Sequence, residues 1–234
     1  MTRFLLCLSI LLAACTARQS APTSSNIEHT GYTLAYDGKT RNASWVYERL
    51  TPASLEGTAD RSRCEFVEDP LIPSPFRATP LDYKGSGFDR GHLRPAANAK
   101  SSPIAMQDTF YLSNVCPQVP QLNRGYWSQL EKYVRTRAMQ YQVLHVYTGP
   151  LYLPHTEADG KRYVKYEVIG ANDVAVPTHF FKVLIGEKTN GGRDIEAYIV
   201  PNSVLPKDAD HSTYRSSLEK VQKAAGTFFL AHTE

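Results

Sequence analysis

Alternating apolar and polar residues predict several β-strands along this chain. The alternation runs from Tyr32 to Tyr36 and less regularly from Trp45 to Leu50, with the turn signal Asp37-Gly38-Lys39 between these segments. The two segments are therefore expected to form a hairpin. More strands are expected after residue 140, where β-branched and aromatic residues are dense. Their expected ranges are Val143–Thr148, Tyr163–Ile169, Val174–Ile185 and Ile195–Val200.

A helical period is strongest between Asn123 and about Gln140. Apolar residues recur there at intervals of three and four, namely Tyr126, Leu130, Tyr133, Val134 and Ala138. A second series at intervals of four contains Asn123, Trp127, Glu131 and Arg135. Because each such step drifts by roughly 40° around a helix, Asn123 and Glu131 can face one cavity. Shorter helices are expected over Pro103–Thr109 and Tyr214–Ala225, with Gly226 ending the last one.

The stretch between the hairpin and the long helix is irregular. Residues 51–83 hold several prolines, which prevent long regular elements. Lys84-Gly85-Ser86-Gly87 permits positive φ, but its spacing matches neither a Walker loop nor a dinucleotide fingerprint. Strands are expected over Phe88–Leu93 and Phe110–Leu112. The whole pattern predicts an α+β fold in which helices pack on a mainly antiparallel sheet.

Length and composition indicate one folded domain. The chain has 234 residues, of which 42% are hydrophobic and 11% are aromatic. That composition excludes an intrinsically disordered protein, and the chain contains no evident internal repeat or second domain boundary. The formal net charge of +3 is too small to indicate a nucleic-acid partner by itself.

The N-terminus resembles a bacterial lipoprotein signal. Arg3 precedes an apolar run that is too short to span a bilayer and that ends in Leu12-Ala13-Ala14-Cys15. We expect removal of a signal peptide (1–14), lipidation of Cys15 and a flexible tether (15–27), followed by one catalytic domain (28–234). Such a protein would be exported and held by its lipid at a bacterial membrane, facing the periplasm or the cell surface. An ordinary secretory signal and a mitochondrial presequence are the alternatives.

Two more cysteines, Cys64 and Cys116, lie in the expected mature domain. They could pair in an oxidising compartment. Sequence spacing does not decide whether their Cα atoms come within bridging distance, so the pairing stays open.

The residues that carry chemistry gather in Asp89-Arg90-Gly91-His92 and, roughly thirty to forty positions later, in Asn123-Arg124-Gly125 and Glu131. An imidazole can take a proton from water near neutral pH. Amide and carboxylate oxygens suit a hard cation such as Mg²⁺, which keeps several waters of its own. A base and a hard cation are together what phosphodiester hydrolysis requires. Taken alone, Asn123 would be read as an ordinary helix N-cap.

Longer motifs carry a family resemblance. They are Ser86–Leu93, Asp108–Val115, Pro117-Gln118, Leu122-Asn123, Trp127, Leu130-Glu131, Tyr147–Leu151, Thr156–Lys161, Tyr163–Tyr166 and Val174–Val183. In this order they resemble the DNA/RNA non-specific endonuclease family, over nearly all of the expected mature chain. The resemblance implies a ββα-metal finger with Phe88–Leu93 as its second strand, a Mg²⁺ cofactor with Mn²⁺ as the alternative, and cleavage of DNA and RNA to 5′-phosphate ends. Members of this family often form homodimers.

The resemblance also implies roles for individual residues. His92 is the expected general base, and Asn123 is the expected direct metal ligand. Glu131 is expected to accept hydrogen bonds from water on the metal, while Asp89 and Asn114 orient the site. Three arginines are expected to contact substrate phosphates, namely Arg61, Arg90 and Arg135. Arg63 is the alternative to Arg61, because the alignment of this segment with the family motif is open. For Arg90, the alternative is a structural ion pair.

Other functions share parts of this pattern. A nucleic-acid-binding lipoprotein with weak catalysis would keep the basic residues, and a phosphodiesterase for small nucleotides would keep the base and the metal. A zinc hydrolase is disfavoured, because the chain has neither HExxH nor CxxC spacing.

Overall fold

The computed structural model describes residues 26–229. The expected signal peptide (1–14), the expected lipidation site Cys15 and nearly all of the expected tether (15–27) lie outside the described residues. The first strand begins at Ile27, so the folded body starts within the last residues assigned to that tether. None of the helices within residues 26–229 is both long and apolar enough to cross a bilayer.

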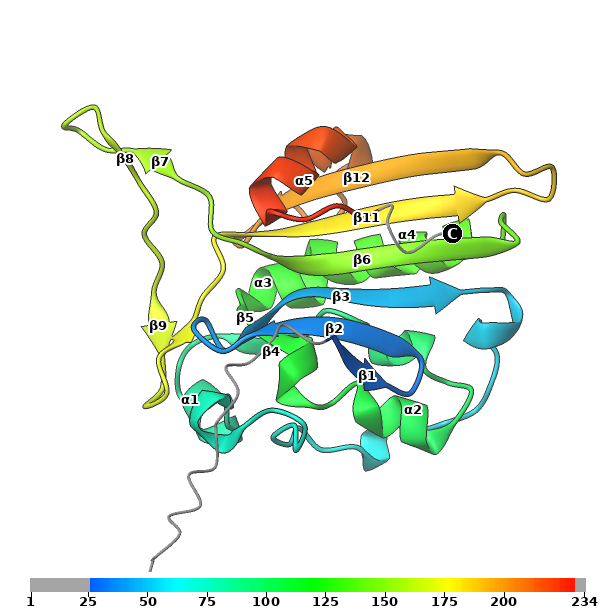
Figure 1. The fold of residues 1–234 in the computed structure, drawn as a ribbon, viewed down its shortest axis with the longest axis horizontal. Coiled ribbons are helices and arrows are strands. Elements are labelled where there is room, and N and C mark those ends of the chain that lie inside the picture. Colours follow the sequence, from blue (N-terminus) through cyan, green and yellow to red (C-terminus); the bar gives the residue numbers. More distant parts are fainter. Residues whose placement is uncertain (1–25, 230–234) are drawn as a thin grey trace, which may run out of the picture.

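A seven-stranded antiparallel sheet runs through the middle of the molecule (Figure 1). Its order is β1-β2-β3-β6-β11-β12-β13. These strands are β1 (Ile27–His29), β2 (Tyr32–Asp37), β3 (Asn42–Leu50), β6 (Val143–Leu151), β11 (His179–Glu187), β12 (Arg193–Pro201) and β13 (Arg215–Ser216). The expected hairpin and the expected strands Val143–Thr148 and Ile195–Val200 are confirmed. The expected strand Val174–Ile185 is wrong as one element, because only its part from His179 onward lies in this sheet.

The remaining strands form two-stranded ladders outside the central sheet. They are β4 (Asp89–His92) with β5 (Val115–Gln118), β7 (His155–Thr156) with β8 (Arg162–Tyr163), and β9 (Val168–Ile169) with β10 (Val174–Ala175). The expected strand Tyr163–Ile169 is therefore wrong as one element. Its ends belong to two different ladders, and the β7–β8 hairpin projects from the body (Figure 1).

The helices are short except for one near the middle of the chain. They are α1 (Pro80–Tyr83), α2 (Pro103–Asp108), α3 (Pro120–Leu122), α4 (Ser128–Ala138) and α5 (Leu218–Ala225), with a π-helical turn, η6 (Asn123–Trp127), joining α3 to α4. Short 3₁₀ turns lie at Ala53–Leu55, Arg61–Arg63, Ser74–Phe76, Ala96–Asn98, Leu112–Asn114 and His211–Tyr214. The expected strand Phe110–Leu112 is wrong, because Tyr111 makes only an isolated bridge to Val67 before the chain turns.

The long helix and the last helix each differ from the expected pattern at one point. The long helix is interrupted at Gly125, whose φ of −106° and ψ of −110° leave the helical region. The last helix starts at Leu218 because the Ser217 side chain caps it by accepting from Lys220 N at 3.2 Å. It ends as expected, with Gly226 in the left-handed conformation at φ 68°.

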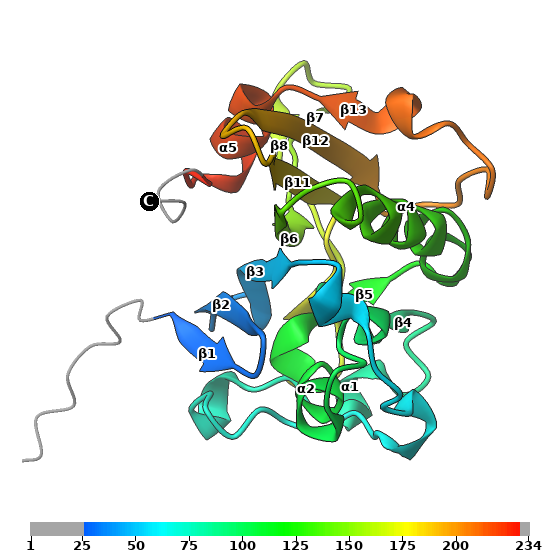
Figure 2. The same cartoon turned by 90° about the vertical axis from the view of Figure 1, so that its right-hand side faces the viewer.

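The sheet buries both of its faces around β11. Phe180 and Leu184 pack with Trp127 and the apolar side of α4, whereas Phe181 and Val183 pack with the residues of α5. Figure 2 shows α4 and α5 on opposite sides of the sheet. A strand covered on both faces reads as a continuous apolar run, which explains the sequence of β11.

The ββα finger lies against the α4 face of the sheet. Strand β4 pairs antiparallel with β5, and the chain then enters α3, η6 and α4. Asp89–His92 is thus the first strand of the finger, and the expectation that it is the second is wrong. Cys116 is buried in β5 and Cys64 is half-buried, and both are free thiols, so the structure contains no Cys64–Cys116 disulfide.

Candidate active site

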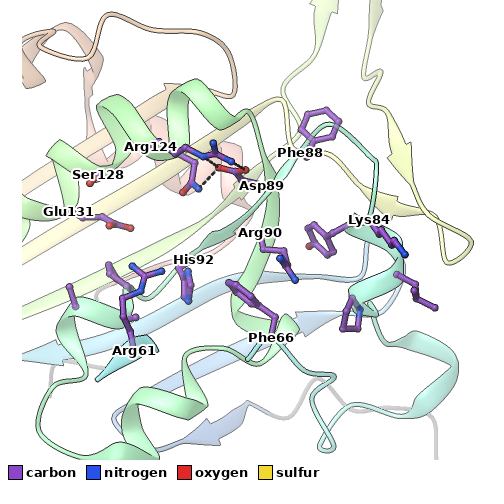
Figure 3. A pocket seen from close by; sticks show the side chains of 17 residues that line it. Arg61, Phe66, Lys84, Phe88, Asp89, Arg90, His92, Arg124, Ser128 and Glu131 are labelled. Carbon is purple, nitrogen blue, oxygen red and sulfur yellow. Dashed lines mark hydrogen bonds and ion pairs between the residues drawn. The ribbon is translucent and has the colours of Figure 1, made fainter. Parts of the chain in front are cut away.

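A cleft of about 720 Å³ opens between the finger, α1, α4 and the turn that contains Arg61 (Figure 3). Its lining is Arg61, Phe66, Pro80, Leu81, Tyr83, Lys84, Phe88, Asp89, Arg90, His92, Pro95, Ala96, Ala97, Asn123, Arg124, Ser128 and Glu131. Arg61, His92 and Glu131 lie toward one end, and Lys84 and Phe88 lie toward the other (Figure 3).

His92 enters the cleft from the last position of β4. The strand can approach β5 closely because residue 91 is glycine: a Cβ there would lie 2.2 Å from Gln118 Oε1. The imidazole packs 5.2 Å from the ring of Phe66 and edge-on, at 4.9 Å, to the ring of Phe110. Its Nε2 has no hydrogen-bond partner within residues 26–229. Burial, with a smaller contribution from the Arg61 charge, lowers the pKa of His92 to about 3, so the ring is a neutral base.

Asn114 holds the chain immediately after His92. It is fully buried, and its side-chain oxygen accepts from Arg94 N at 2.9 Å. Its Nδ2 donates to the carbonyls of Arg94, at 3.0 Å, and Thr109, at 2.8 Å. Asn114 does not line the cleft, so its contribution is to fix the backbone on which the imidazole stands.

Asp89 fixes the amide of Asn123. The Asp89 carboxylate accepts from Asn123 Nδ2 at 2.9 Å and from Arg124 Nε at 2.7 Å. A carboxylate accepts only, so the nitrogen of Asn123 must face Asp89 and its Oδ1 is left as an acceptor. Burial alone would raise the pKa of Asp89, but the hydrogen bonds from Arg124 and Asn123 reverse the shift and lower it, so Asp89 stays ionised.

Glu131 lies on α4, two turns beyond Asn123. Burial raises the pKa of Glu131 to about 7, and the positive charges of Lys182 and Arg135 limit that rise. Its carboxylate is therefore poised to change charge near neutral pH.

The donor set of the cleft fits a hard cation. Within residues 26–229, no group of three or more His, Cys, Asp or Glu could hold a metal ion. The free amide oxygen of Asn123 and the nearby Glu131 carboxylate would therefore leave a cation most of its waters, which is how Mg²⁺ binds in many proteins. Such a donor set does not suit Zn²⁺.

The rest of the cleft favours an anionic ligand. Basic side chains line it at Arg61, Lys84, Arg90 and Arg124. The Arg90 guanidinium lies 4.6 Å from the ring centroid of Phe66, and that of Arg61 lies 5.9 Å from Phe110. These aromatic contacts hold the cations without using up their hydrogen-bond donors.

Comparison with known proteins decides the family. The family model for the DNA/RNA non-specific endonuclease matches residues 14–234. The chain belongs to the DNA/RNA non-specific endonuclease family. It is 52% identical to "Endonuclease G, mitochondrial" of Homo sapiens over 199 residues, which are 85% of this chain and 67% of the relative. It is 45% identical to the protein of the same name in Caenorhabditis elegans over 217 residues, or 91% and 70% of the two chains.

Solved structures of the family agree with the fold. The crystal structure "of the EndoG/EndoGI complex: Mechanism of EndoG inhibition" superposes with a TM-score of 0.86 at 44% identity. The match covers 89% of this chain and 86% of that chain. The expected α+β fold, with its antiparallel sheet and ββα finger, is confirmed.

Most of the residues expected for a family nuclease converge. His92, Asn123, Glu131, Asp89, Arg90 and Arg61 line one cleft. Arg63, the alternative to Arg61 as a phosphate contact, lies along a separate cavity. Arg135 does not line the cleft, and its Nη1 donates to Asn98 Oδ1 at 3.3 Å.

Sequence reasoning gave no role to two cations that belong to the nuclease cleft. Arg124 stands next to the expected ligand Asn123 and pairs with Asp89, and Lys84 precedes the glycine pair before the finger. The signal for Arg124 was its place inside a motif already singled out. Lys84 had no distinguishing signal, since an exposed lysine beside glycines is common in surface loops.

Proposed function

We propose that this protein is a metal-dependent endonuclease that hydrolyses the phosphodiester bonds of DNA and RNA. The observation that carries the proposal is the convergence of two groups on one basic cleft. They are the unpartnered Nε2 of His92 and the amide of Asn123, whose oxygen is left free by its bond to Asp89. A proton acceptor and a cation-binding oxygen are the two parts that this hydrolysis needs.

His92 accepts a proton from water at Nε2, because burial keeps the ring neutral. The activated water attacks phosphorus in line with the departing 3′ oxygen, which leaves a 5′-phosphate end. Asn123 would hold the cation through Oδ1, and Glu131 would accept hydrogen bonds from the water around it. A bound divalent cation, Mg²⁺ with Mn²⁺ as the alternative, supplies positive charge to the phosphate in the transition state.

The lining of the cleft supports a substrate that is held by its phosphates. Arg61, Lys84 and Arg90 present positive charge, and phosphate contacts carry no sequence information. Both DNA and RNA would satisfy them, which accounts for cleavage without sequence preference.

We place the enzyme outside the bacterial cytoplasm, anchored by lipid on Cys15. The pattern of residues 1–15 supports this location, and export keeps a non-specific nuclease away from the genome of its own cell. The endonucleases G compared above are named as mitochondrial, and a mitochondrial location is the alternative. Mass spectrometry of the mature protein tests the proposal. We expect a lipid-modified Cys15 at the N-terminus, and an unmodified N-terminus at any other residue contradicts it.

The variant His92→Ala tests the catalytic proposal. We expect cleavage of plasmid DNA and of RNA to fall by about 10²–10⁴-fold, because no other group takes the proton. His155→Ala is the matched control, since that side chain is 49% exposed on the projecting hairpin. EDTA should abolish the activity of the wild type, while DNA binding in EDTA stays the same in wild type and His92→Ala.

Two results would contradict the proposal: unchanged turnover in His92→Ala, or full activity in EDTA. Long DNA and a dinucleotide are compared in the same assay. Equal turnover of the two substrates would favour a phosphodiesterase for small nucleotides.

A further inference from the structure

A second cavity lies outside the cleft, next to the turn that contains Arg61. It encloses about 550 Å³ between the 3₁₀ turn Arg61–Arg63 and the start of α2. Its positive charge comes from Arg63 and Lys100, and its neutral polar side chains are Thr58, Ser101 and Gln107. None of these five residues has a part in the proposed cleavage site.

The cleft and the second cavity share two walls. Arg61 lines the cleft, whereas Arg63, two residues later on the same turn, lines the second cavity. Because a 3₁₀ helix has three residues per turn, side chains two positions apart point about 120° away from each other. On the other wall, Ala97 lines the cleft and Lys100 lines the second cavity. The two hollows are therefore neighbours, separated by one turn and one short segment.

One apolar cluster lies beneath both hollows. Its buried members are Ala96, Met106 and Phe110, and Cys64 and Phe66 pack against them. Phe66 also lines the cleft, while Cys64 and Met106 line the second cavity. A common packed base keeps the cleft and the second cavity in a fixed relative position.

The second cavity continues the cleft beyond its catalytic end. Figure 3 shows Arg61 and His92 toward one end of the cleft and Lys84 toward the other. The turn that begins at Arg61 leads directly to Arg63 and the second cavity. A strand whose scissile phosphate lies at His92 would therefore pass Lys84 on one side and reach the second cavity on the other.

The backbone that closes the second cavity is anchored to Lys100. Ala59 N donates to the carbonyl of Lys100 at 3.1 Å. Gly57 has a φ of 134°, and a Cβ at this position would lie 2.0 Å from the same carbonyl oxygen. Only glycine permits this approach. The loop thus fixes the backbone of Lys100, and the ammonium of this residue stands at a defined place on the rim.

The two cations of the second cavity remain available to an anion. Within residues 26–229, neither Arg63 nor Lys100 forms an ion pair. The carboxylate of Asp60 also lines the cavity, and it accepts from Ser62 N at 2.9 Å and from Ser62 Oγ at 2.7 Å. These hydrogen bonds, with a smaller contribution from the Arg63 charge, lower the pKa of Asp60, so it stays ionised. Two cations against one carboxylate leave a net positive charge that suits phosphate oxygens.

We propose that the second cavity binds the sugar–phosphate backbone of a nucleic-acid strand beyond the scissile phosphate, with Arg63 and Lys100 as the phosphate contacts. The inference rests on the proposed function and adds a binding site outside the cleft. Each phosphate that a cation neutralises releases counterions, so contacts on both sides of the scissile bond bind the strand more tightly than contacts on one side. Arg63 and Lys100 act in binding, and neither touches the scissile phosphate.

The first test is the binding of a fluorescently labelled single strand of DNA in EDTA across a series of NaCl concentrations. We expect Arg63→Gln/Lys100→Gln to bind roughly ten- to thirtyfold more weakly than wild type at about 0.1 M salt. The slope of log affinity against log salt concentration should become shallower by about 1.4, which is about 0.7 for each lost phosphate contact. Each single variant should show about half of that change in slope.

The matched control is Lys220→Gln/Lys223→Gln. It removes the same charge from two exposed positions on α5, which lies on the opposite side of the sheet from α4 (Figure 2). This variant should keep the wild-type slope. Arg63→Lys/Lys100→Arg, which keeps both charges in the second cavity, should also keep it.

The second test is cleavage of a long single strand in Mg²⁺. We expect KM of Arg63→Gln/Lys100→Gln to rise roughly ten- to thirtyfold with kcat unchanged, because a contact away from the reacting phosphate is the same in the bound substrate and in the transition state. A fall in kcat with KM unchanged would contradict a role in binding.

The outcomes separate the inference from the proposed function. A wild type that binds DNA with the expected slopes but does not cleave it overturns the proposed function and leaves the second cavity supported as a binding site. An unchanged slope in Arg63→Gln/Lys100→Gln overturns the inference. An equal loss in Lys220→Gln/Lys223→Gln also overturns it, because net charge alone would then explain the result. The same holds for a shallower slope in the variant that keeps both charges.

Discussion

The link between Asp89 and Asn123 offers the sharpest prediction from the site. In the variant Asp89→Asn, residue 89 can present either an oxygen or an NH₂ group to its neighbour. Asn123 then loses the constraint that points its Nδ2 toward residue 89 and its Oδ1 away from it. In the flipped state the amide presents hydrogen atoms in place of the oxygen, and it cannot bind a cation.

The size of the effect follows from the strength of that constraint. A hydrogen bond to a charged group contributes about 1.5–3 kcal/mol, and a difference of about 1.4 kcal/mol changes an equilibrium constant tenfold. Loss of a partner that orients a metal ligand typically lowers metal affinity or activity by about 10–100-fold. The ion pair between Asp89 and Arg124 adds little stability, because the Arg124 side chain is 73% exposed, and exposed pairs contribute at most about 1 kcal/mol. Activity should therefore fall steeply while the melting temperature barely changes.

The assay is plasmid cleavage across a Mg²⁺ titration, with thermal unfolding measured on the same samples. We expect Asp89→Asn to need more Mg²⁺ for half-maximal rate and to keep a kcat/KM about 10–100-fold lower. Asp194→Asn is the matched control, since Asp194 makes a similar exposed pair with Lys188 at 2.7 Å but lies away from the cleft. A wild-type Mg²⁺ dependence in Asp89→Asn would refute the reasoning, as would an equal loss in Asp194→Asn.

Two further predictions concern stability. Leu130→Ala removes a fully buried side chain from the core between α4 and the sheet, so thermal unfolding should show that the free energy of unfolding falls by about 2–5 kcal/mol. The control is Leu81→Ala, at a position 74% exposed, which should change the free energy of unfolding by less than about 0.5 kcal/mol. Equal losses in the two variants would contradict the packing of α4. At Asp69, burial would raise the pKa, but hydrogen bonds from His29, Ser113 and Leu71 N lower it overall. A lowered folded pKa means that this stability is present above the ordinary Asp pKa and is lost as the pH falls through the folded value. The melting temperature of wild type should thus drop below about pH 4 more steeply than that of Asp69→Asn, and parallel curves would remove Asp69 from the acid sensitivity.

The centre of the site could be predicted because its residues are close in sequence. His92 and Asp89 share one short strand, and the helical drift between Asn123 and Glu131 is small enough to keep both in one cleft. Arg135 follows in the same series, and its expected phosphate contact stays a prediction. Four residues beyond Glu131, it does not line the cleft, and its Nη1 donates to Asn98 Oδ1.

The contacts that could not be predicted join residues far apart in the chain. His29 lies on β1, and its Nε2 is 2.8 Å from Asp69, forty positions away. The pattern of β11 marked it as a strand, but no local signal showed that Lys182 inside it would be buried against Trp127. Such pairings depend on which strands become neighbours, and hydrophobic periodicity does not carry that information.

The charges of the cleft fall into two groups that do different work. Arg61, Lys84 and Arg90 stand where water and salt reach them, so they can attract and release a polyanion at little cost in desolvation. His92 packs against the rings of Phe66 and Phe110, and burial lowers its pKa to about 3, so the ring is neutral near pH 7. Burial acts in the opposite sense on Glu131: it raises the pKa of that carboxyl, and the positive charges of Lys182, Arg135 and Arg61 limit the rise.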